Sequence, residues 1–389
     1  MLEALVTKLR ASARALLPGA HEMTSAFFRA DFPCGVTRTA SLLLPVLLVA
    51  CGGGEPSGPS RSRGTEASSL STTGLVPLND LLSGTYQGFT GGLYPQGRNS
   101  MPAAHSTAGQ AQAAAIQPLN VNGQPSASGK YVLLSIGMSN TTQEFCSHTG
   151  ALPCEAWTFM GQAARDASVN KSTLVIANGA MSSQAALTWD APTDSNYERV
   201  RTDVLEAQGL SEKQVQIIWL KVANIGPSVS LPASNADAYQ LKRSIGNILR
   251  AAKVRYPNLK QAFISSRIYG GYATSSLNPE PYAYESGFAV KWVVEAQIRQ
   301  KLSGTIDSRA GNLDYDQGIA PWAAWGPYLW ADGLTPRSDG LIWEEDDFVM
   351  TDRTHPAKPA ETKVGTMLLD FFKSSPHTRC WFLAGQTCP

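Results

Sequence analysis

Residues 131–136 read Tyr-Val-Leu-Leu-Ser-Ile and end at Gly137. The apolar residues follow one another without the alternation of a strand that exposes one face to water, and a glycine closes the run. A short apolar run of this kind is typical of a strand buried on both faces of a parallel sheet. We therefore take it as the first strand of such a sheet.

Similar runs follow along the chain and alternate with longer stretches of helical length. The further strand candidates are residues 174–177, 215–220 and 262–265, and the helix candidates are 155–167, 197–208, 235–255, 286–302 and 357–373. Alternation of strand and helix favours a parallel sheet covered on both faces. The sequence thus predicts the α/β class, as a three-layer α/β/α sandwich around a mostly parallel sheet.

Length and composition fit one large domain or two smaller ones and exclude other classes of protein. The chain has 389 residues, of which 43% are hydrophobic and 16% charged, so it can bury a core and is not a disordered chain. Lys and Arg number 32 against 31 Asp and Glu, without a basic block, so no nucleic-acid partner is expected. Residues 75–129 are poor in large apolar residues, and we assign residues 75–389 to one domain.

Polar residues that can carry chemistry follow the predicted strands. Ser139 comes after the first strand, Gly179 after the second and Asn224 after the third, and Asp352 and His355 lie near the C-terminus. Ligands of open parallel sheets bind beyond the carboxyl ends of the strands. A serine, donor groups on neighbouring loops, and an Asp and a His three residues apart are the parts of an acyl-transfer site.

This set resembles the SGNH hydrolases of the GDSL esterase group, over residues 130–373. The resemblance implies a flavodoxin-like fold and a serine esterase. Ser139 would be the nucleophile, His355 the base and Asp352 the residue that orients it, while Gly179, Asn224 and the Ser139 backbone N–H would form the oxyanion hole. An imidazole must accept the serine proton before the hydroxyl becomes a good nucleophile, and a carboxylate fixes the imidazole tautomer.

The motif around the serine departs from the group's Gly-Asp-Ser-Leu. Here it reads Gly-Met-Ser-Asn, closer to the Gly-Gln-Ser-Asn of carbohydrate acetylesterase branches. We therefore expect an ester substrate, an acylated carbohydrate first. The alternatives are a lipase or general carboxylesterase on the same fold, and a surface lipoprotein that binds without turnover. No dinucleotide or phosphate loop is visible, so no cofactor is expected.

The first 50 residues predict export. Residues 41–50 form an apolar run too short for a permanent membrane span, and Leu48-Val49-Ala50-Cys51 with the glycines that follow resembles the bacterial lipobox. Residues 1–50 would be the signal peptide, with Met23 as an alternative start, and Cys51 would be lipidated. Residues 51–74 would be a flexible tether. We expect an exported lipoprotein of the cell envelope, periplasmic or at the cell surface, that meets the membrane only through its lipid.

Four further cysteines remain, in two close pairs, Cys146 with Cys154 and Cys380 with Cys388. Export places them in an oxidising compartment, so disulfides are expected, and local pairing is the simplest of three connectivities. Zinc is the rival interpretation, but neither pair has the usual ligand spacing, and no metal site is predicted.

Two clusters near the C-terminus leave alternatives open. The aromatic residues Trp322, Trp325, Tyr328, Trp330 and Trp343 can stack on sugars or acyl groups, or fill the core. The acidic run 344–347 can hold a calcium ion or form a solvated turn, and we favour the turn.

Overall fold

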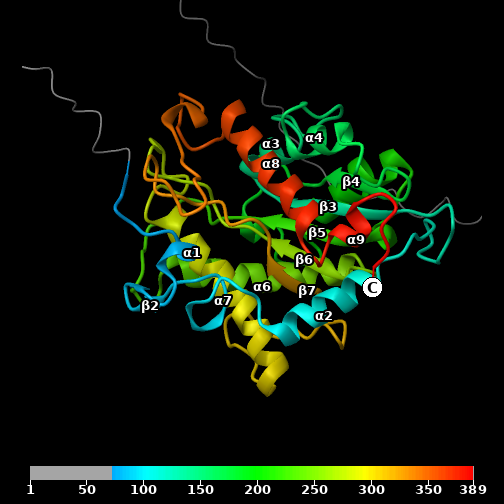
Figure 1. Ribbon diagram of the computed structural model, residues 1–389, viewed down its shortest axis with the longest axis horizontal. Helices are drawn as coiled ribbons and strands as arrows, with labels where there is room; N and C mark the ends of the chain where they lie inside the picture. Colours follow the sequence, from blue (N-terminus) through cyan, green and yellow to red (C-terminus); the bar gives the residue numbers. More distant parts are fainter. Residues whose placement is uncertain (1–71, 389) are drawn as a thin grey trace, which may run out of the picture. The chain divides into compact units, whose positions relative to one another are not determined.

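A computed structural model describes residues 72–388, and Figure 1 shows its helices and strands. The predicted signal peptide with its alternative start at Met23, the lipidation site Cys51 and most of the tether lie outside the described residues.

A five-stranded sheet forms the centre of the described part. Its strands are β3 (Tyr131–Gly137), β4 (Leu174–Asn178), β5 (Val215–Lys221), β6 (Gln261–Ile264) and β7 (Trp322–Trp325). They lie in the order β4-β3-β5-β6-β7, and every neighbouring pair is parallel. This is the flavodoxin-like order, in which the direction of strand addition reverses between β3 and β5. The predicted α/β class and parallel sheet are confirmed.

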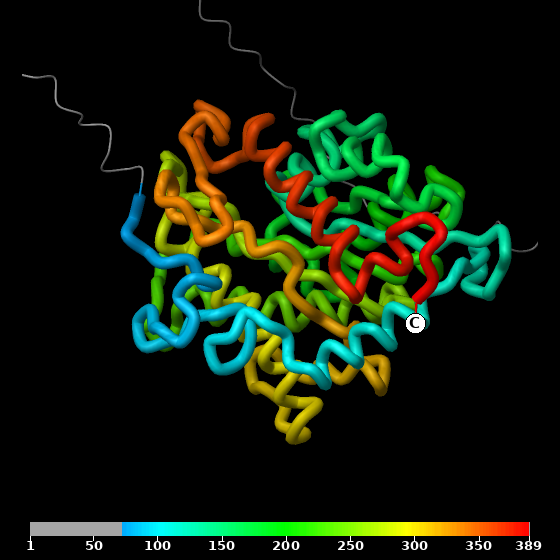
Figure 2. Tube along the Cα trace, in the orientation of Figure 1, coloured from blue at the N-terminus to red at the C-terminus, as the bar shows by residue number. Residues whose placement is uncertain are grey.

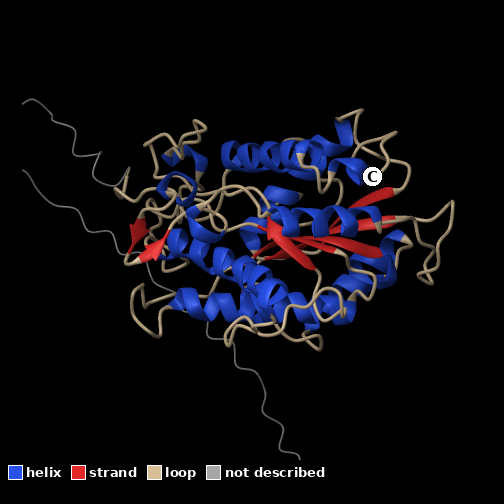
Figure 3. Cartoon of the chain, turned by 60° about the horizontal axis from the view of Figure 1, so that its bottom comes forward, coloured by secondary structure: helices blue, strands red, loops and turns tan. Residues whose placement is uncertain are grey.

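Helices cover both faces of this sheet (Figure 3). The larger helices are α2 (Ala103–Ala114), α6 (Asp237–Arg255), α7 (Tyr282–Ser303) and α8 (Lys358–Ser374), and the shorter ones near the site are α3 (Ser139–Phe145) and α4 (Phe159–Arg165). Helices α6 and α7 pack together, whereas α8 packs against α3, α4 and α9 (Arg379–Phe382). Each predicted helix is present within a few residues of its expected bounds, although the predicted 197–208 helix is divided into α5 (Ser195–Arg199) and a π-helical turn at Val200–Leu205.

The fifth strand was not predicted. Strand β7 consists of Trp-Ala-Ala-Trp, in which all four residues are buried. It pairs with β6 from Gln261↔Trp322 to Ile264↔Trp325. A four-residue run dominated by two tryptophans gives little periodicity, so only the pairing with β6 identifies it as a strand.

The N-terminal part of the domain lies against segments far along the chain (Figure 2). It includes the short helix α1 (Leu78–Leu81) and the hairpin β1 (Thr85–Tyr86) and β2 (Phe89–Thr90). The Thr73 hydroxyl and backbone N–H donate to Asp332 at 2.6 and 2.7 Å, and the Leu78 N–H donates to the Tyr328 hydroxyl at 3.1 Å. The packed domain therefore begins at least two residues before the predicted boundary at 75.

The described residues contain two disulfides, Cys146–Cys154 and Cys380–Cys388, both between cysteines that are close in sequence. Among residues 72–388, no helix is long and apolar enough to cross a membrane.

Candidate active site

The turn after β3 places Ser139 at the carboxyl edge of the sheet. Strand β3 ends at Gly137, and α3 begins two residues later at Ser139. A Cβ atom at position 137 would lie 2.2 Å from the Lys221 carbonyl oxygen of the neighbouring strand and 2.4 Å from the Thr141 hydroxyl. Only glycine allows this close approach of the chain to β5. The serine thus stands at the switch point between β3 and β5, where this fold binds ligands.

Helix α3 is fixed to β5 by two contacts. The Thr141 hydroxyl donates to the Lys221 carbonyl oxygen at 2.6 Å. The Glu144 carboxylate and the Lys221 ammonium form an ion pair whose side chains are both fully buried. Because a buried charge without its partner is strongly unfavourable, this pair fixes α3 to the strand and holds Ser139 in place.

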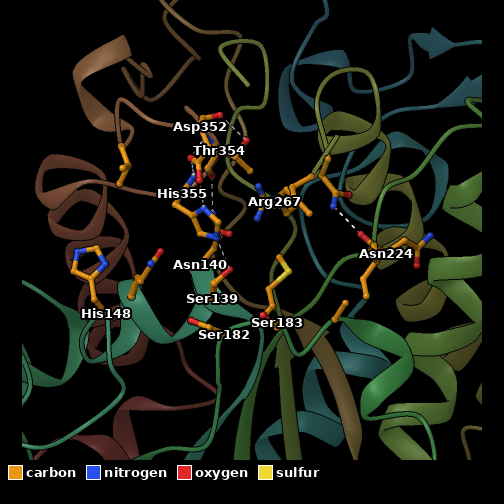
Figure 4. Close-up of a pocket in the computed structure, with 17 residues that line it drawn as sticks. Ser139, Asn140, His148, Ser182, Ser183, Asn224, Arg267, Asp352, Thr354 and His355 are labelled. Carbon is orange, nitrogen blue, oxygen red and sulfur yellow. Dashed lines mark hydrogen bonds and ion pairs between the residues drawn. The ribbon is translucent and has the colours of Figure 1, made fainter. Parts of the chain in front are cut away.

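Ser139, His355 and Asp352 form a chain of hydrogen bonds. The Ser139 Oγ and His355 Nε2 atoms are 2.7 Å apart, and the His355 Nδ1 and Asp352 Oδ2 atoms are 2.6 Å apart. Ser139 is the first residue of α3, just after β3, whereas Asp352 and His355 lie in the loop before α8, and His355 is 216 residues from the serine. Figure 4 shows the three side chains meeting at one side of a pocket.

Backbone hydrogen bonds orient the Asp352 carboxylate toward the His355 imidazole. Its Oδ1 accepts the backbone N–H groups of Thr354 at 2.9 Å and His355 at 3.0 Å, which leaves Oδ2 for the imidazole. Burial acts to raise the pKa of Asp352, but the hydrogen bonds from His355 and Thr354 outweigh it, so the pKa lies below its ordinary value. A carboxylate that stays ionised can keep a proton on Nδ1 and leave Nε2 free to accept one.

The pocket beside these residues has a volume of about 680 Å³. Much of its lining is apolar and comes from Met138, Ala185, Ile225, Leu277 and Val349. The ionisable side chains that line it are His148, Arg267, Asp352 and His355. No Trp, Tyr or Phe lines this pocket in the part of the chain that the structure describes. An apolar cavity with a few convergent polar groups is the usual form of a small-molecule site.

Gly179 lies outside the pocket lining, contrary to its predicted place in an oxyanion hole. Its backbone N–H donates to the Ser135 hydroxyl at 3.1 Å, within the sheet. A Cβ atom at this position would lie 2.7 Å from the Ser135 carbonyl oxygen. The glycine is therefore explained by close packing of β4 on β3, and its amide is occupied.

Asn224 lines the pocket, but its side-chain amide points elsewhere. The Nδ2 atom donates to the Asp237 backbone carbonyl oxygen at 2.9 Å, and the backbone carbonyl oxygen of Asn224 accepts from the Asn278 side chain at 2.8 Å. Figure 4 shows Asn224 on the far side of the pocket from Ser139. In this arrangement Asn224 is not an oxyanion donor for Ser139.

The loop after β4 instead brings Ser182 and Ser183 into the wall of the pocket that Ser139 lines, and Figure 4 labels all three residues. Ser183 has a φ of 66°, in the left-handed region that is uncommon for serine. Within residues 72–388, the backbone N–H groups of Ser182 and Ser183 donate no hydrogen bond. No local pattern predicts this turn, because a pair of serines is common in loops.

A second unpredicted pair lies at the pocket edge. His148, in the loop closed by the Cys146–Cys154 disulfide, approaches the buried carboxylate of Glu361 to 3.1 Å. The two residues are far apart in sequence, and only the packing of α8 against α3 brings them together.

Neither of the two C-terminal clusters lines this pocket. Each of the five aromatic side chains is buried, Trp322, Trp330 and Trp343 completely, so they belong to the core. The acidic run lies mainly in a short 3₁₀ turn at Glu345–Asp347. Among the described residues, no group of three or more His, Cys, Asp or Glu is placed to hold a metal ion.

No protein-family model and no curated protein matches this sequence. Solved structures give distant likenesses only. A Bacillus subtilis protein is 14% identical with a TM-score of 0.31, and the match covers 64% of this chain but only 57% of that one. A Parabacteroides merdae protein described provisionally as a GDSL-like lipase is 14% identical with a TM-score of 0.32, covering 66% and 97%. A Slackia heliotrinireducens protein described provisionally as an SGNH hydrolase is 14% identical with a TM-score of 0.29, covering 62% and 99%.

Proposed function

We propose that the protein is a serine esterase that works through an acyl-enzyme on Ser139. The observation that carries the proposal is the hydrogen-bonded chain from Ser139 through His355 to Asp352 in the wall of an apolar pocket. In the first step His355 Nε2 takes the hydroxyl proton as Ser139 Oγ attacks the ester carbonyl, and the imidazolium then gives that proton to the departing alcohol. Water attacks the acyl-enzyme by the same route in reverse, which releases the acid and the free serine.

The negative oxygen of the tetrahedral intermediate needs N–H donors near Ser139. We assign this part to the backbone N–H of Ser139, which as the first residue of α3 has no acceptor within the helix, and to the backbone of Ser182 and Ser183. These groups replace Gly179 and Asn224, whose donors are engaged elsewhere.

The pocket lining favours an aliphatic ester over a sugar. Aromatic side chains commonly stack on the faces of sugar rings, and the five aromatic residues for which such stacking was one of two alternatives are buried in the core. Ile225 and Leu277 instead present apolar surface to the pocket and are 67% and 40% exposed. A carboxylesterase for aliphatic esters is thus our first choice of substrate class, and an acylated carbohydrate is the second.

We also propose that the enzyme is exported and anchored by a lipid on Cys51, on the strength of the lipobox-like residues alone. Cys51→Ser should release the protein from the membrane fraction or leave its leader uncleaved. Unchanged fractionation and unchanged mass of the variant would rule out the anchor.

A fluorophosphonate probe tests the enzyme proposal, because it reacts with an activated serine and spares an ordinary one. The wild type should be labelled at Ser139 and should hydrolyse para-nitrophenyl acetate and butyrate. Folded Ser139→Ala should show neither property. A wild type that is neither labelled nor active would support the binding-lipoprotein alternative instead.

A further inference from the structure

Arg267 is a buried cation in the wall of the pocket. It lies three residues after the end of β6, at the carboxyl edge of the sheet, and is only 2% exposed. It lines the same pocket as Ser139 and His355, and Figure 4 shows its guanidinium nitrogens on the side that faces His355. Buried arginines are normally paired or hydrogen-bonded, because an unpaired charge is costly to remove from water.

In the part of the chain that the structure describes, the Arg267 guanidinium has no such partner. Within residues 72–388, only the backbone N–H of Arg267 donates a hydrogen bond, to the Ser286 hydroxyl at 3.1 Å, and the side-chain Nε is buried without an acceptor. Arg337 is also buried, but its guanidinium is hydrogen-bonded and paired, as is usual for a buried arginine with a structural role. Its guanidinium donates to the Tyr328 and Trp330 carbonyl oxygens at 2.8 and 2.9 Å and pairs with Asp339 at 2.7 Å.

The carboxylates around Arg267 are already engaged. Glu144 is paired with Lys221, and Asp352 with His355. Glu280 accepts from the Gly270 and Tyr284 backbone and from the Trp330 indole. Burial lowers the pKa of Arg267 to about 10, while Glu144, Glu280 and Asp352 oppose this shift, so the guanidinium is charged at neutral pH. The positive charge therefore remains available to a ligand.

We propose that Arg267 binds a carboxylate on the substrate, so that the enzyme selects esters that carry an acidic group. The inference rests on the proposed esterase function. A guanidinium presents parallel N–H donors that match the two oxygens of a carboxylate, and such a pair is strongest where water is excluded. The apolar lining at Ile225, Leu277 and Val349 would hold the uncharged part of the same molecule.

Kinetics on matched esters test the selection. Para-acetoxybenzoate carries its carboxylate on the alcohol part of the ester, and para-nitrophenyl hydrogen succinate carries it on the acyl part. Each is compared with its own methyl ester, which is neutral. Losing a charge-assisted hydrogen-bonded pair lowers affinity by about 10 to 100-fold. At least one acidic ester should therefore have a KM about tenfold or more below that of its neutral partner.

Arg267→Met should abolish this preference by raising the KM of the acidic ester, and Arg267→Lys should restore part of it. Arg243→Met, at an exposed position of α6, is the matched control and should keep the preference. An equal loss of kcat on acidic and neutral esters would overturn the proposal, because Arg267 would then act on the oxyanion. An unchanged preference in Arg267→Met would overturn it as well.

Binding to Ser139→Ala separates this inference from the esterase proposal, since it needs no turnover. Calorimetry should find benzoate bound at least about tenfold more tightly than benzamide, and equal affinities would overturn the inference. A wild type that hydrolyses esters without acid preference defeats this inference alone. A wild type that binds benzoate through Arg267 but hydrolyses nothing defeats the esterase proposal alone. Arg267→Met should also melt a few degrees above the parent, because it removes an unpaired buried charge.

Discussion

The side-chain amide of Asn140 donates a hydrogen bond of 3.0 Å to the backbone carbonyl oxygen of Thr354. These residues are 214 positions apart, yet one directly follows Ser139 and the other directly precedes His355. The bond is buried and joins the two loops that must be in register for the serine to reach the imidazole. Asn140 is therefore a positioning residue for the proposed reaction.

Asn140→Ala should lower kcat by about 10 to 100-fold, because a shift of the order of 1 Å between reacting groups costs that much. The KM should change little, since the apolar lining is intact. Asn258→Ala is the matched control, as Asn258 makes the same kind of bond, to the Lys213 carbonyl oxygen at 2.8 Å, at an exposed site. Steady-state kinetics that show equal effects of the two substitutions would refute the positioning role.

Ser139 and His355 should behave as one unit. Each single alanine substitution should lower kcat on the order of 10⁴ to 10⁶-fold, and the double variant should lose little more, because a base without its nucleophile has nothing to activate. Kinetics on para-nitrophenyl acetate with the two single variants and the double variant measure this. Additive losses in the double variant would mean that the residues act independently.

The outline of the fold was predictable because each buried strand of β3 to β6 is a continuous apolar run that a polar or small residue closes. Ser139 was singled out because it follows such a run, since strand ends meet at one edge of a parallel sheet, whereas His355 was singled out by the Asp-x-x-His pattern near the C-terminus. Strand β7 was not predicted, because its four residues show no hydrophobic periodicity. Its two tryptophans could be buried in the core of a strand or of an insertion alike.

The remaining site residues depend on contacts that no local pattern encodes. Gly179 was assigned a catalytic part, but the strand spacing explains it, because a side chain there would meet the Ser135 backbone. Arg267 looks like any polar residue that follows a strand, and only the packed structure shows that its side chain is buried without a hydrogen-bond partner among residues 72–388. His148 and Glu361 meet only because α8 packs on the layer that contains α3.

The pH profile of kcat/KM should show a single ionisation on its acid side. Burial acts to raise the pKa of Asp352, but the hydrogen bonds from His355 and Thr354 lower it below its ordinary value. The Asp352 carboxylate therefore stays ionised between about pH 5 and 8, where an ordinary imidazole changes its charge. The serine proton needs an unprotonated imidazole nitrogen as its acceptor. The kcat/KM should therefore decrease on the acid side with a limiting slope of one in a logarithmic plot.

Asp352→Asn provides the comparison for this profile. It keeps the shape of the side chain but removes the charge that stabilises the imidazolium, so kcat should fall on the order of 10⁴-fold. An acid limb with a slope of two in the wild type, or full activity of Asp352→Asn, would contradict the assignment of Asp352.

Asn224→Ala should have a small effect on turnover, less than about tenfold in kcat. Removing a true oxyanion donor costs about 10² to 10³-fold, but the Asn224 amide nitrogen is bonded to the Asp237 carbonyl oxygen. The kcat of the variant on para-nitrophenyl acetate decides between these values. A loss of 10²-fold or more would mean that the amide turns toward Ser139 when substrate binds.

The two disulfides should contribute equally to stability but differently to activity. Both join cysteines with a sequence separation of 8, so the chain-entropy model gives each about 2.5 kcal/mol of unfolding free energy. Only the loop between Cys146 and Cys154 carries a pocket residue, His148, which approaches Glu361. The double substitution of Cys146 and Cys154 by serine should therefore raise the KM for esters, whereas the same change at Cys380 and Cys388 should lower the denaturation midpoint alone. An unchanged KM after loss of the Cys146–Cys154 disulfide would show that His148 lines the pocket without the help of that disulfide.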